Sequence, residues 1–430
     1  MAELTERDPA VVAAPTLGVL AAPRRTRFAA LEVPTFRWYW IVSWISQTGD
    51  GMENVIRGYL VVQLVGLAGA PFWLGMMVFA HWVPFTVFAL YGGVLADRYD
   101  PRKVQIVAQL LLLTAALGVA IATLSNIVTV WWIFGLLLVH GFAGAIGNPA
   151  QQTLIHSIVG RERLLSAVSL NSTMRQFSQV IGPAVAGFVF LAFGAGWGFL
   201  VNAMTFIPLL VFLSLVHIKR LHEGERRPAM DALREGLGYV RQRPLLGSLI
   251  GIEAVTVIFL GHTFNSLLVV FAVDRFPTIP LAYPFLLVAS GVGAIVAAVY
   301  LGSARERKRP ALFIALTAMV EMLAILLFAF SGEYAVSLAL MLVVGAAGVI
   351  TASLTNTTLQ LSAPDRIRGR VMGAYTFGTQ GLRVVNGPLL GALAIAFGVP
   401  LAVAGSAGLV LVVLGGVVLA VPQLRAAGPA

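Results

Sequence analysis

The chain has 430 residues, of which 58% are hydrophobic and only 11% are charged, and its formal net charge is +10. Soluble domains carry about 25% charged residues, so this composition excludes a water-soluble globule and requires lipid as the surrounding solvent. Cysteine is absent, which excludes disulfides, thiolate nucleophiles and cysteine-based metal sites.

Twelve apolar segments follow a polar N-terminal tail. Residues 1–36 lack the apolar core and cleavage site of a signal peptide, so we expect a cytoplasmic tail. The segments after it have roughly 20–28 residues each, enough to cross a hydrocarbon layer of about 30 Å. The predicted membrane helices lie at about 37–65, 72–95, 104–124, 130–155, 165–192, 197–217, 245–272, 281–302, 310–331, 334–360, 368–397 and 400–421.

These segments fall into two sets of six, which predicts an N-terminal bundle at 37–217 and a C-terminal bundle at 245–421. A polar linker at 218–244 joins the bundles, and a second cytoplasmic tail follows at 422–430. We interpret the linker as a solvated connector between the bundles. The alternative is that residues 229–240 form a short amphipathic helix on the membrane surface. The fold class predicted is all-α integral membrane, with twelve transmembrane helices.

The basic residues indicate the orientation of the chain. Of the 29 Lys and Arg residues, 25 lie in the tails, in the linker and in the loops on the same side of the membrane, or at the helix ends that adjoin them. The opposite side carries only Arg275, and the other three lie within predicted helices. Because Lys and Arg collect on the cytoplasmic side, we expect both termini in the cytoplasm of a multi-pass protein of the plasma (inner) membrane. The positive charge thus does not indicate binding to nucleic acid.

A weak internal repeat relates the two halves. The segment 79–98 aligns with 288–307, and 161–187 aligns with 365–391. Both members of the second pair begin with a basic loop and continue into a helix that contains a Gly-Pro step. In each pair, the two segments run in the same direction and are separated by an even number of helices. This pattern is typical of two parallel six-helix repeats related by an axis along the membrane normal.

A loop motif lies between the second and third predicted helices. It comprises Gly93, Asp97 and Arg98 in the run GVLADRY, followed by Arg102 and Lys103. This motif resembles the signature of the major facilitator superfamily, although Asp100 and Pro101 replace the usual Gly and Arg. A degenerate copy at 302–309 fits as well, and the resemblance extends from about residue 36 to the end of the twelfth helix. It implies the major facilitator fold, with two pseudo-symmetric bundles and alternating access.

The loop motif also has a physical interpretation. A carboxylate at Asp97 can bind the nearby cations or the N-terminus of a neighbouring helix, and Gly93 permits close helix approach. The resemblance implies that such contacts latch the bundles in the outward-open state. The alternative is a cluster of charges that only stops translocation.

Within the superfamily the chain resembles the drug-exporter branch, which includes macrolide-efflux and enterobactin-export proteins. The marks are the loop motif, the segment GLGYVRQRPLL at 236–246 and the Gly182-Pro183 step in the fifth helix. In the antiporter motif of exporters paired glycines follow, whereas Ala186-Gly187 follows here. Proline removes a helix hydrogen bond, so Gly182-Pro183 and Gly387-Pro388 are expected to bend their helices during transport or to serve as packing notches.

Charged residues inside predicted helices are the sharper functional signal. A charge at mid-bilayer costs at least about 2.5–3.5 kcal/mol on insertion scales, so it usually faces a bundle interior or an aqueous cavity. Asp50, Glu53 and Arg57 share one side of the first helix. We hypothesise that Asp50 or Glu53 loads and releases a proton, with Arg57 or Arg175 as its ionic partner. The alternative is a fixed Glu53–Arg57 pair at i, i+4.

Three other charged residues in helices have open roles. Glu253 in the seventh helix is a second proton-coupling candidate. Arg175 and Arg383 are ion-pair candidates that would otherwise recognise an anionic substrate, because guanidinium suits oxyanions. Glu321 is expected to be structural or to extend its carboxylate toward the membrane surface, since the resemblance makes its helix peripheral.

Aromatic and histidine side chains complete the set of candidates. His81, His140 and His262 are isolated in sequence, and we interpret them as satisfied helix-interior residues. The residues proposed to line the substrate cavity are Phe79, Trp82, Phe142, Phe259 and Phe264.

No enzymatic constellation is present. The sequence lacks a GxxxxGK[ST] phosphate loop and an HExxH metal motif, so we expect no ATP, metal or cofactor, and the proton gradient as the energy source. The predicted function is secondary active, proton-coupled export of an amphipathic organic compound by a monomer. Uptake or facilitated transport of a small solute on the same fold is the alternative. A membrane receptor or scaffold and an intramembrane enzyme are more distant ones.

Overall fold

The computed structural model describes residues 28–216, 229–303, 310–364 and 367–425, with the backbone alone at 89–98, 229–233, 262, 302–303, 368 and 425. Helices account for nearly all of this part of the chain, and it contains no strand. The elements are η1 (Ala29–Glu32), α1 (Pro34–Arg98), α2 (Pro101–Leu124), α3 (Val130–Leu215), α4 (Ala229–Arg241), α5 (Pro244–Phe259), α6 (Gly261–Arg275), α7 (Ala282–Ser303), α8 (Pro310–Ala329), α9 (Tyr334–Ser362), α10 (Arg368–Thr376), η2 (Phe377–Gly381), α11 (Arg383–Phe397), α12 (Val399–Ala420) and α13 (Pro422–Arg425).

The two longest elements are divided by glycines. α1 has 65 residues and α3 has 86, so at about 1.5 Å per residue each far exceeds the thickness of a bilayer. α1 leaves helical geometry at Gly66, where φ is 71°. α3 does so at Gly160 and Gly194, where φ is 70° and 80°. Only glycine adopts these angles readily, and each of the three joins two helical segments.

Nine helical stretches in the described ranges are long and apolar enough to cross a membrane, counting α5 with α6 and α10 with α11. Their bounds follow the predicted segments closely. α8 at Pro310–Ala329 matches 310–331, and α12 at Val399–Ala420 matches 400–421. The prediction of an all-helical membrane protein is therefore confirmed.

Two predicted helices are interrupted. The segment predicted at 245–272 breaks between α5 and α6 at Leu260, where φ is −122° and ψ is −57°. The segment predicted at 368–397 contains the π-helical turn η2 between α10 and α11. Both interruptions lie where polar side chains of other helices enter, which periodicity alone does not reveal.

Part of the linker is attached to the C-terminal helices. α4 packs along α10, and Gly236 allows this approach, because a Cβ at Gly236 would meet the backbone of Arg370. Glu235 forms an ion pair with Arg370. The linker therefore contains a helix, which was the alternative to the favoured solvated connector, and this helix lies against α10. Residues 217–228 of the linker and 1–27 of the first tail lie outside the described residues.

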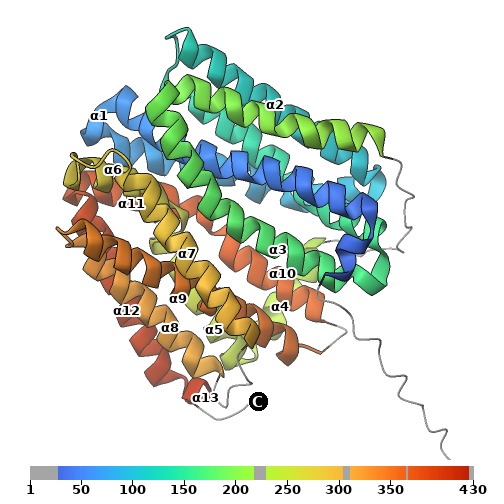
Figure 1. Cartoon of the computed structure of the whole chain (residues 1–430). Helices are drawn as coiled ribbons and strands as arrows, with labels where there is room; N and C mark the ends of the chain where they lie inside the picture. Colours follow the sequence, from blue (N-terminus) through green and yellow to red (C-terminus); the bar gives the residue numbers. More distant parts are fainter. Residues whose placement is uncertain (1–27, 217–228, 304–309, 365–366, 426–430) are drawn as a thin grey trace, which may run out of the picture.

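Figure 1 shows the elements from α1 to α3 on one side of the molecule and those from α5 to α12 on the other. We call them the N-group and the C-group. Within the N-group α1 and α2 pack along α3, and within the C-group α7 and α8 pack along α9. The groups meet where α1 contacts α11 and α6, and where α3 contacts α7.

Several of these contacts between the groups lie near the end of the molecule that carries Gly66 and Gly194. The hydroxyl of Tyr59 donates to the carbonyl of Pro280 at 3.0 Å, and its ring lies 5.5 Å from the ring of Tyr283. Gly187 lies against Pro284, since a Cβ there would be 2.9 Å from the proline ring. The N-group and C-group are thus in direct contact at this end.

Candidate functional site

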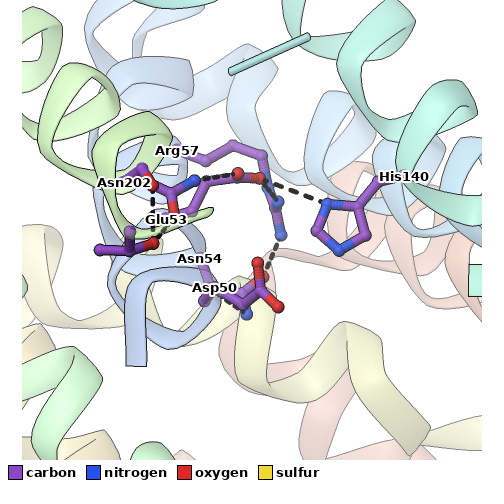
Figure 2. A network of polar contacts seen from close by, with 7 residues as sticks. Asp50, Glu53, Asn54, Arg57, His140 and Asn202 are labelled. Carbon is purple, nitrogen blue, oxygen red and sulfur yellow. Dashed lines mark hydrogen bonds and ion pairs between the residues drawn. The ribbon is translucent and has the colours of Figure 1, made fainter. Parts of the chain in front are cut away.

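The charged residues of the first segment of α1 form a connected network. Glu53 Oε1 accepts from Arg57 Nη1 at 3.1 Å, which is the predicted i, i+4 pair. Arg57 Nη2 donates to Asn54 Oδ1, and Asn54 Nδ2 donates to the carbonyl of Asp50 at 3.2 Å. Figure 2 shows the Arg57 guanidinium between Glu53 and the Asp50–Asn54 turn.

α3 completes the surroundings of Glu53. Asn202 Nδ2 donates to Glu53 Oε2 at 2.6 Å, and His140 Nδ1 lies 3.9 Å from Glu53 Oε1. Asn202 is 0% exposed and Glu53 1%. Gly49 makes room for this contact, because a Cβ there would lie 2.6 Å from Asn202 Oδ1. Both oxygens of Glu53 are therefore engaged by fixed donors.

Asp50, one helical turn before Glu53, has a different environment. Its Oδ1 is buried and accepts no hydrogen bond from the residues that the structure describes. It borders a cavity of about 230 Å³ between the two segments of α1, α3 and α6. The residues lining this cavity are Asp50, Asn54, Arg57, Leu74, Met77, Val78, His81, Trp82, Leu137, His140 and Ser266. The cavity therefore combines apolar walls with a few polar groups, as small-molecule sites do.

The C-group approaches this cavity through Arg383. Its guanidinium lies over the ring of Trp82 at 4.6 Å from the centroid, a cation–π arrangement, while its Nε donates to the carbonyl of Thr379 at 3.1 Å. Arg383 is also within electrostatic reach of Glu253. Glu253 Oε1 is buried and makes no hydrogen bond with a described residue. Arg175 has an exposed side chain on α3 and does not line the cavity.

Among the aromatic candidates only Trp82 lines this cavity. Phe264 packs in the core, with its ring 5.9 Å from that of Phe328. Phe142 is 36% exposed and stacks edge-on against Phe88. Phe79 and Phe259 are half-buried at other positions.

The described part of the loop motif holds the ends of two helices. Asp100 Oδ1 accepts from the backbone N–H of Arg102 at 2.9 Å and Pro101 occupies the first turn of α2, so the residues that depart from the superfamily pattern form a helix cap. Arg102 Nε and Nη2 donate to the carbonyls of Leu213 and Ser214 at 2.5 and 2.9 Å. Lys103 is exposed. The side chains of Gly93, Asp97 and Arg98 lie outside the described residues.

Both Gly-Pro steps are packing notches in this structure. A Cβ at Gly182 would lie 2.8 Å from the Cα of Gly51, which neighbours Asp50, so this contact sets the position of the charged turn. A Cβ at Gly387 would lie 3.0 Å from the backbone nitrogen of Phe79 in the N-group. The helix continues through Pro183 and Pro388 without a break.

The structure adds residues that the sequence did not single out together. His81 and His140 are 59 residues apart in the sequence, yet their ring centroids are only 5.2 Å apart. His140 Nδ1 is buried and makes no hydrogen bond with a described residue, so the expectation of a satisfied histidine was wrong for this atom. Asn202 lies 149 residues from Glu53, and only its polar character inside an apolar segment signals a role. Within the described ranges, no group of three side chains is suited to a metal ion.

Comparisons with known proteins point to transport. The family model described as transmembrane secretion effector matches residues 25–429. The enterobactin exporter EntS of Shigella flexneri is 26% identical over 383 residues, covering 89% of this chain and 90% of the exporter. The solved nucleoside transporter NupG shares the fold with a TM-score of 0.70 at 14% identity, covering 90% of this chain and 98% of its own.

A D-xylose–proton symporter shares the fold with a TM-score of 0.64 at 15% identity, covering 92% of this chain and 97% of its own. These relatives are transporters and not enzymes, as the sequence predicted. The chain is therefore a multi-pass membrane transporter and belongs to the transmembrane secretion effector family of the major facilitator superfamily.

Proposed function

We propose that the protein is a secondary active transporter that exports an amphipathic organic compound, drug-like or siderophore-like, in exchange for protons. The observation that carries this proposal is the state of Asp50. Its Oδ1 is buried beside a cavity without a hydrogen-bond donor from the described residues. A carboxylate with this surrounding is favoured in its neutral form and gains its charged form when water or a cation reaches it. The name of the relative EntS, an enterobactin exporter, supports a siderophore-like substrate.

Asp50 and Glu53 have separate roles in this proposal. Glu53 accepts from Arg57 and from Asn202, so both of its carboxylate oxygens are occupied by donors. It serves as the fixed counter-charge of Arg57. Asp50 carries the exchanged proton, because it borders the cavity and lacks a partner that would hold it ionised. Glu253, whose Oε1 also lacks a hydrogen-bond partner among the described residues, is a second ionisable candidate in the C-group.

The transport cycle in this proposal is alternating access between two six-helix bundles. The breaks at Gly66, Gly160 and Gly194 add three segments to the nine apolar stretches, which makes twelve crossings. Contacts such as Tyr59–Pro280 close the end that the charge distribution assigns to the outside. Both termini are then cytoplasmic, in the plasma (inner) membrane. One chain encloses the cavity, so a monomer is sufficient.

Liposomes containing the purified protein and an internal pH probe test this function. We expect an outward-directed gradient of substrate to drive proton movement for at least one of three test substrates: enterobactin, erythromycin or ethidium. Asp50→Asn should reduce that proton movement to the level of empty liposomes. Asp274→Asn, at an exposed position on α6, is the matched control and should keep it. Substrate movement without any proton flux in the wild type would contradict proton coupling, and full coupling in Asp50→Asn would contradict its assignment.

A further inference from the structure

His140 occupies the boundary between the cavity and the buried carboxylate of Glu53. Its side chain lines the cavity together with Asp50, Arg57 and His81. Its Nδ1 points to Glu53 Oε1 across 3.9 Å, which is too long for a hydrogen bond. Figure 2 shows the imidazole facing the network of Glu53 and Arg57 from the opposite helix.

The Nδ1 atom is the unusual feature of this histidine. It is buried and has no hydrogen-bond partner among the described residues, although buried polar atoms are almost always paired. A neutral imidazole offers one donor and one acceptor, whereas the protonated ring offers a donor at both nitrogens. A small approach by the protonated ring would let Nδ1–H donate to Glu53 Oε1 while Nε2–H faces the cavity.

We propose that His140 is a proton-relay residue that exchanges a single proton with Asp50 through the cavity. This inference rests on the proposed function and deepens it by naming the second position of the transported proton. In one state the Asp50 O–H bond is intact, His140 is neutral and Arg57 is held by Glu53. In the other state that O–H bond has broken, the proton has passed through a cavity water to form the N–H bond of His140, and Asp50 is ionised.

The contacts of Arg57 link the two states. Arg57 Nη1 and His140 Nδ1 lie 3.1 and 3.9 Å from the same oxygen of Glu53. An imidazolium at His140 therefore competes with Arg57 for Glu53 Oε1. Arg57 already reaches Asn54, whose amide holds the carbonyl of Asp50. The guanidinium is thus placed to stabilise Asp50 when its charge appears, because an opposite charge nearby favours the charged form.

The groups facing His140 come from several packed elements. The first segment of α1 presents Asp50, Glu53 and Arg57, and the second presents His81, with ring centroids 5.2 Å apart. α6 contributes the hydroxyl of Ser266. Arg383 of α11 lies over the ring of Trp82, which is another residue of the cavity wall. Of these groups, Glu53 is the anionic neighbour of His140 at 3.9 Å, and Arg57 is the cationic residue that lines the same cavity.

Two transport modes separate the relay from a structural role. Counterflow exchange needs only a working cavity, whereas uphill export in the liposomes described above needs the proton gradient. With the same three test substrates, we expect His140→Gln to lower gradient-driven export much more than counterflow, so that the ratio of export to counterflow falls at least about tenfold below that of the wild type. His156→Gln, the same change on the same helix but outside the cavity, is the control and should keep both.

The outcomes are distinguishable. Gradient-driven export by His140→Gln equal to wild type would overturn the relay and leave the proposed function intact. A wild type that shows counterflow but no gradient-driven export would overturn the proposed function and the relay with it. Loss of counterflow and export together in His140→Gln would indicate a structural residue and also count against the relay.

A second measurement does not depend on the folding of His140→Gln. The chain has six histidines, and selective ¹³C labelling of their imidazoles allows each to be titrated by NMR, with His81→Gln used to separate the two cavity signals. We expect the His140 signal to change its titration midpoint by at least about half a pH unit in Asp50→Asn and to remain unchanged in Asp274→Asn. An identical titration in all three proteins would overturn the relay.

Discussion

Asn386 of α11 fills the break between α5 and α6 by bonding to Thr263. The backbone N–H of Thr263 donates to Asn386 Oδ1 at 2.9 Å, and the Thr263 hydroxyl donates to the same oxygen. Asn386 Nδ2 in turn donates to the carbonyl of Ile258 at 3.1 Å. Both residues are 0% exposed. Because the bilayer core offers no water to free backbone groups, this one side chain allows a membrane helix to be broken at Leu260 and Gly261.

Asn386→Ala should therefore destabilise the protein. The change leaves a backbone donor and a backbone acceptor of the break without partners, at a cost of about 1–3 kcal/mol for each buried group. Thermal unfolding of the purified protein in detergent should show a clear decrease in the midpoint. Asn356→Ala is the control, since its bond with Gln360 is exposed, and it should change stability by less than about 0.5 kcal/mol. Equal midpoints for the two variants would contradict this role of Asn386.

The two carboxylates of α1 should differ in their effect on stability. Glu53→Gln removes the counter-charge of Arg57, whose side chain is only 14% exposed. Breaking a buried ion pair from one side costs about 3–5 kcal/mol. Asp50→Asn removes no described contact of the carboxylate, so its cost should remain below about 1 kcal/mol. Thermal unfolding of both variants measures the difference, and similar losses would contradict the separate roles.

Much of the fold could be predicted from apolar segment length and the distribution of Lys and Arg, because lipid imposes both. The break in α5–α6 could not. Gly247, Gly251 and Gly261 look alike in the sequence, and the break occurs at the one that faces Asn386, which contacts Thr263 from 123 residues away. Such a break depends on a residue that is distant in the sequence, so the local sequence around the break does not predict it.

The site shows the same division. The Glu53–Arg57 pair could be predicted because i, i+4 spacing places two side chains on one helix face. The difference between Asp50 and Glu53 could not, since it comes from Asn202 and His140 of α3. Both residues stand alone in apolar segments, and only the packing of α3 against α1 brings them to the carboxylates.

Arg102 should act on stability through the end of α3. Its two donor groups hold the carbonyls of Leu213 and Ser214, which no longer have partners within the helix. Arg102→Ala should lower the free energy of unfolding by about 1–3 kcal/mol, and Arg102→Lys should recover only part, because one ammonium cannot reproduce the planar fork. Lys103→Ala, at an exposed neighbour, is the control. A variant with unchanged stability but altered transport would instead favour the latch between bundles.

A cysteine pair across the two groups tests alternating access directly. A Cβ at Gly187 of α3 would lie 3.1 Å from the Cβ of Pro284 of α7, close to the separation of about 3.5–4.5 Å found in disulfides. The chain has no cysteine of its own, so Gly187→Cys with Pro284→Cys introduces the only two thiols. Oxidation should form the bridge in the state described here and stop transport, and reduction should restore it.

The bridge is quantified by the loss of maleimide labelling, and transport is measured in the same liposomes. Each single variant controls for the effect of its substitution and should be insensitive to the oxidant. If α3 and α7 must separate at this end to release substrate, then transport falls in proportion to the fraction of bridged protein. Undiminished transport by fully bridged protein would mean that this contact persists throughout the cycle, and the exit pathway would then have to open elsewhere in the molecule.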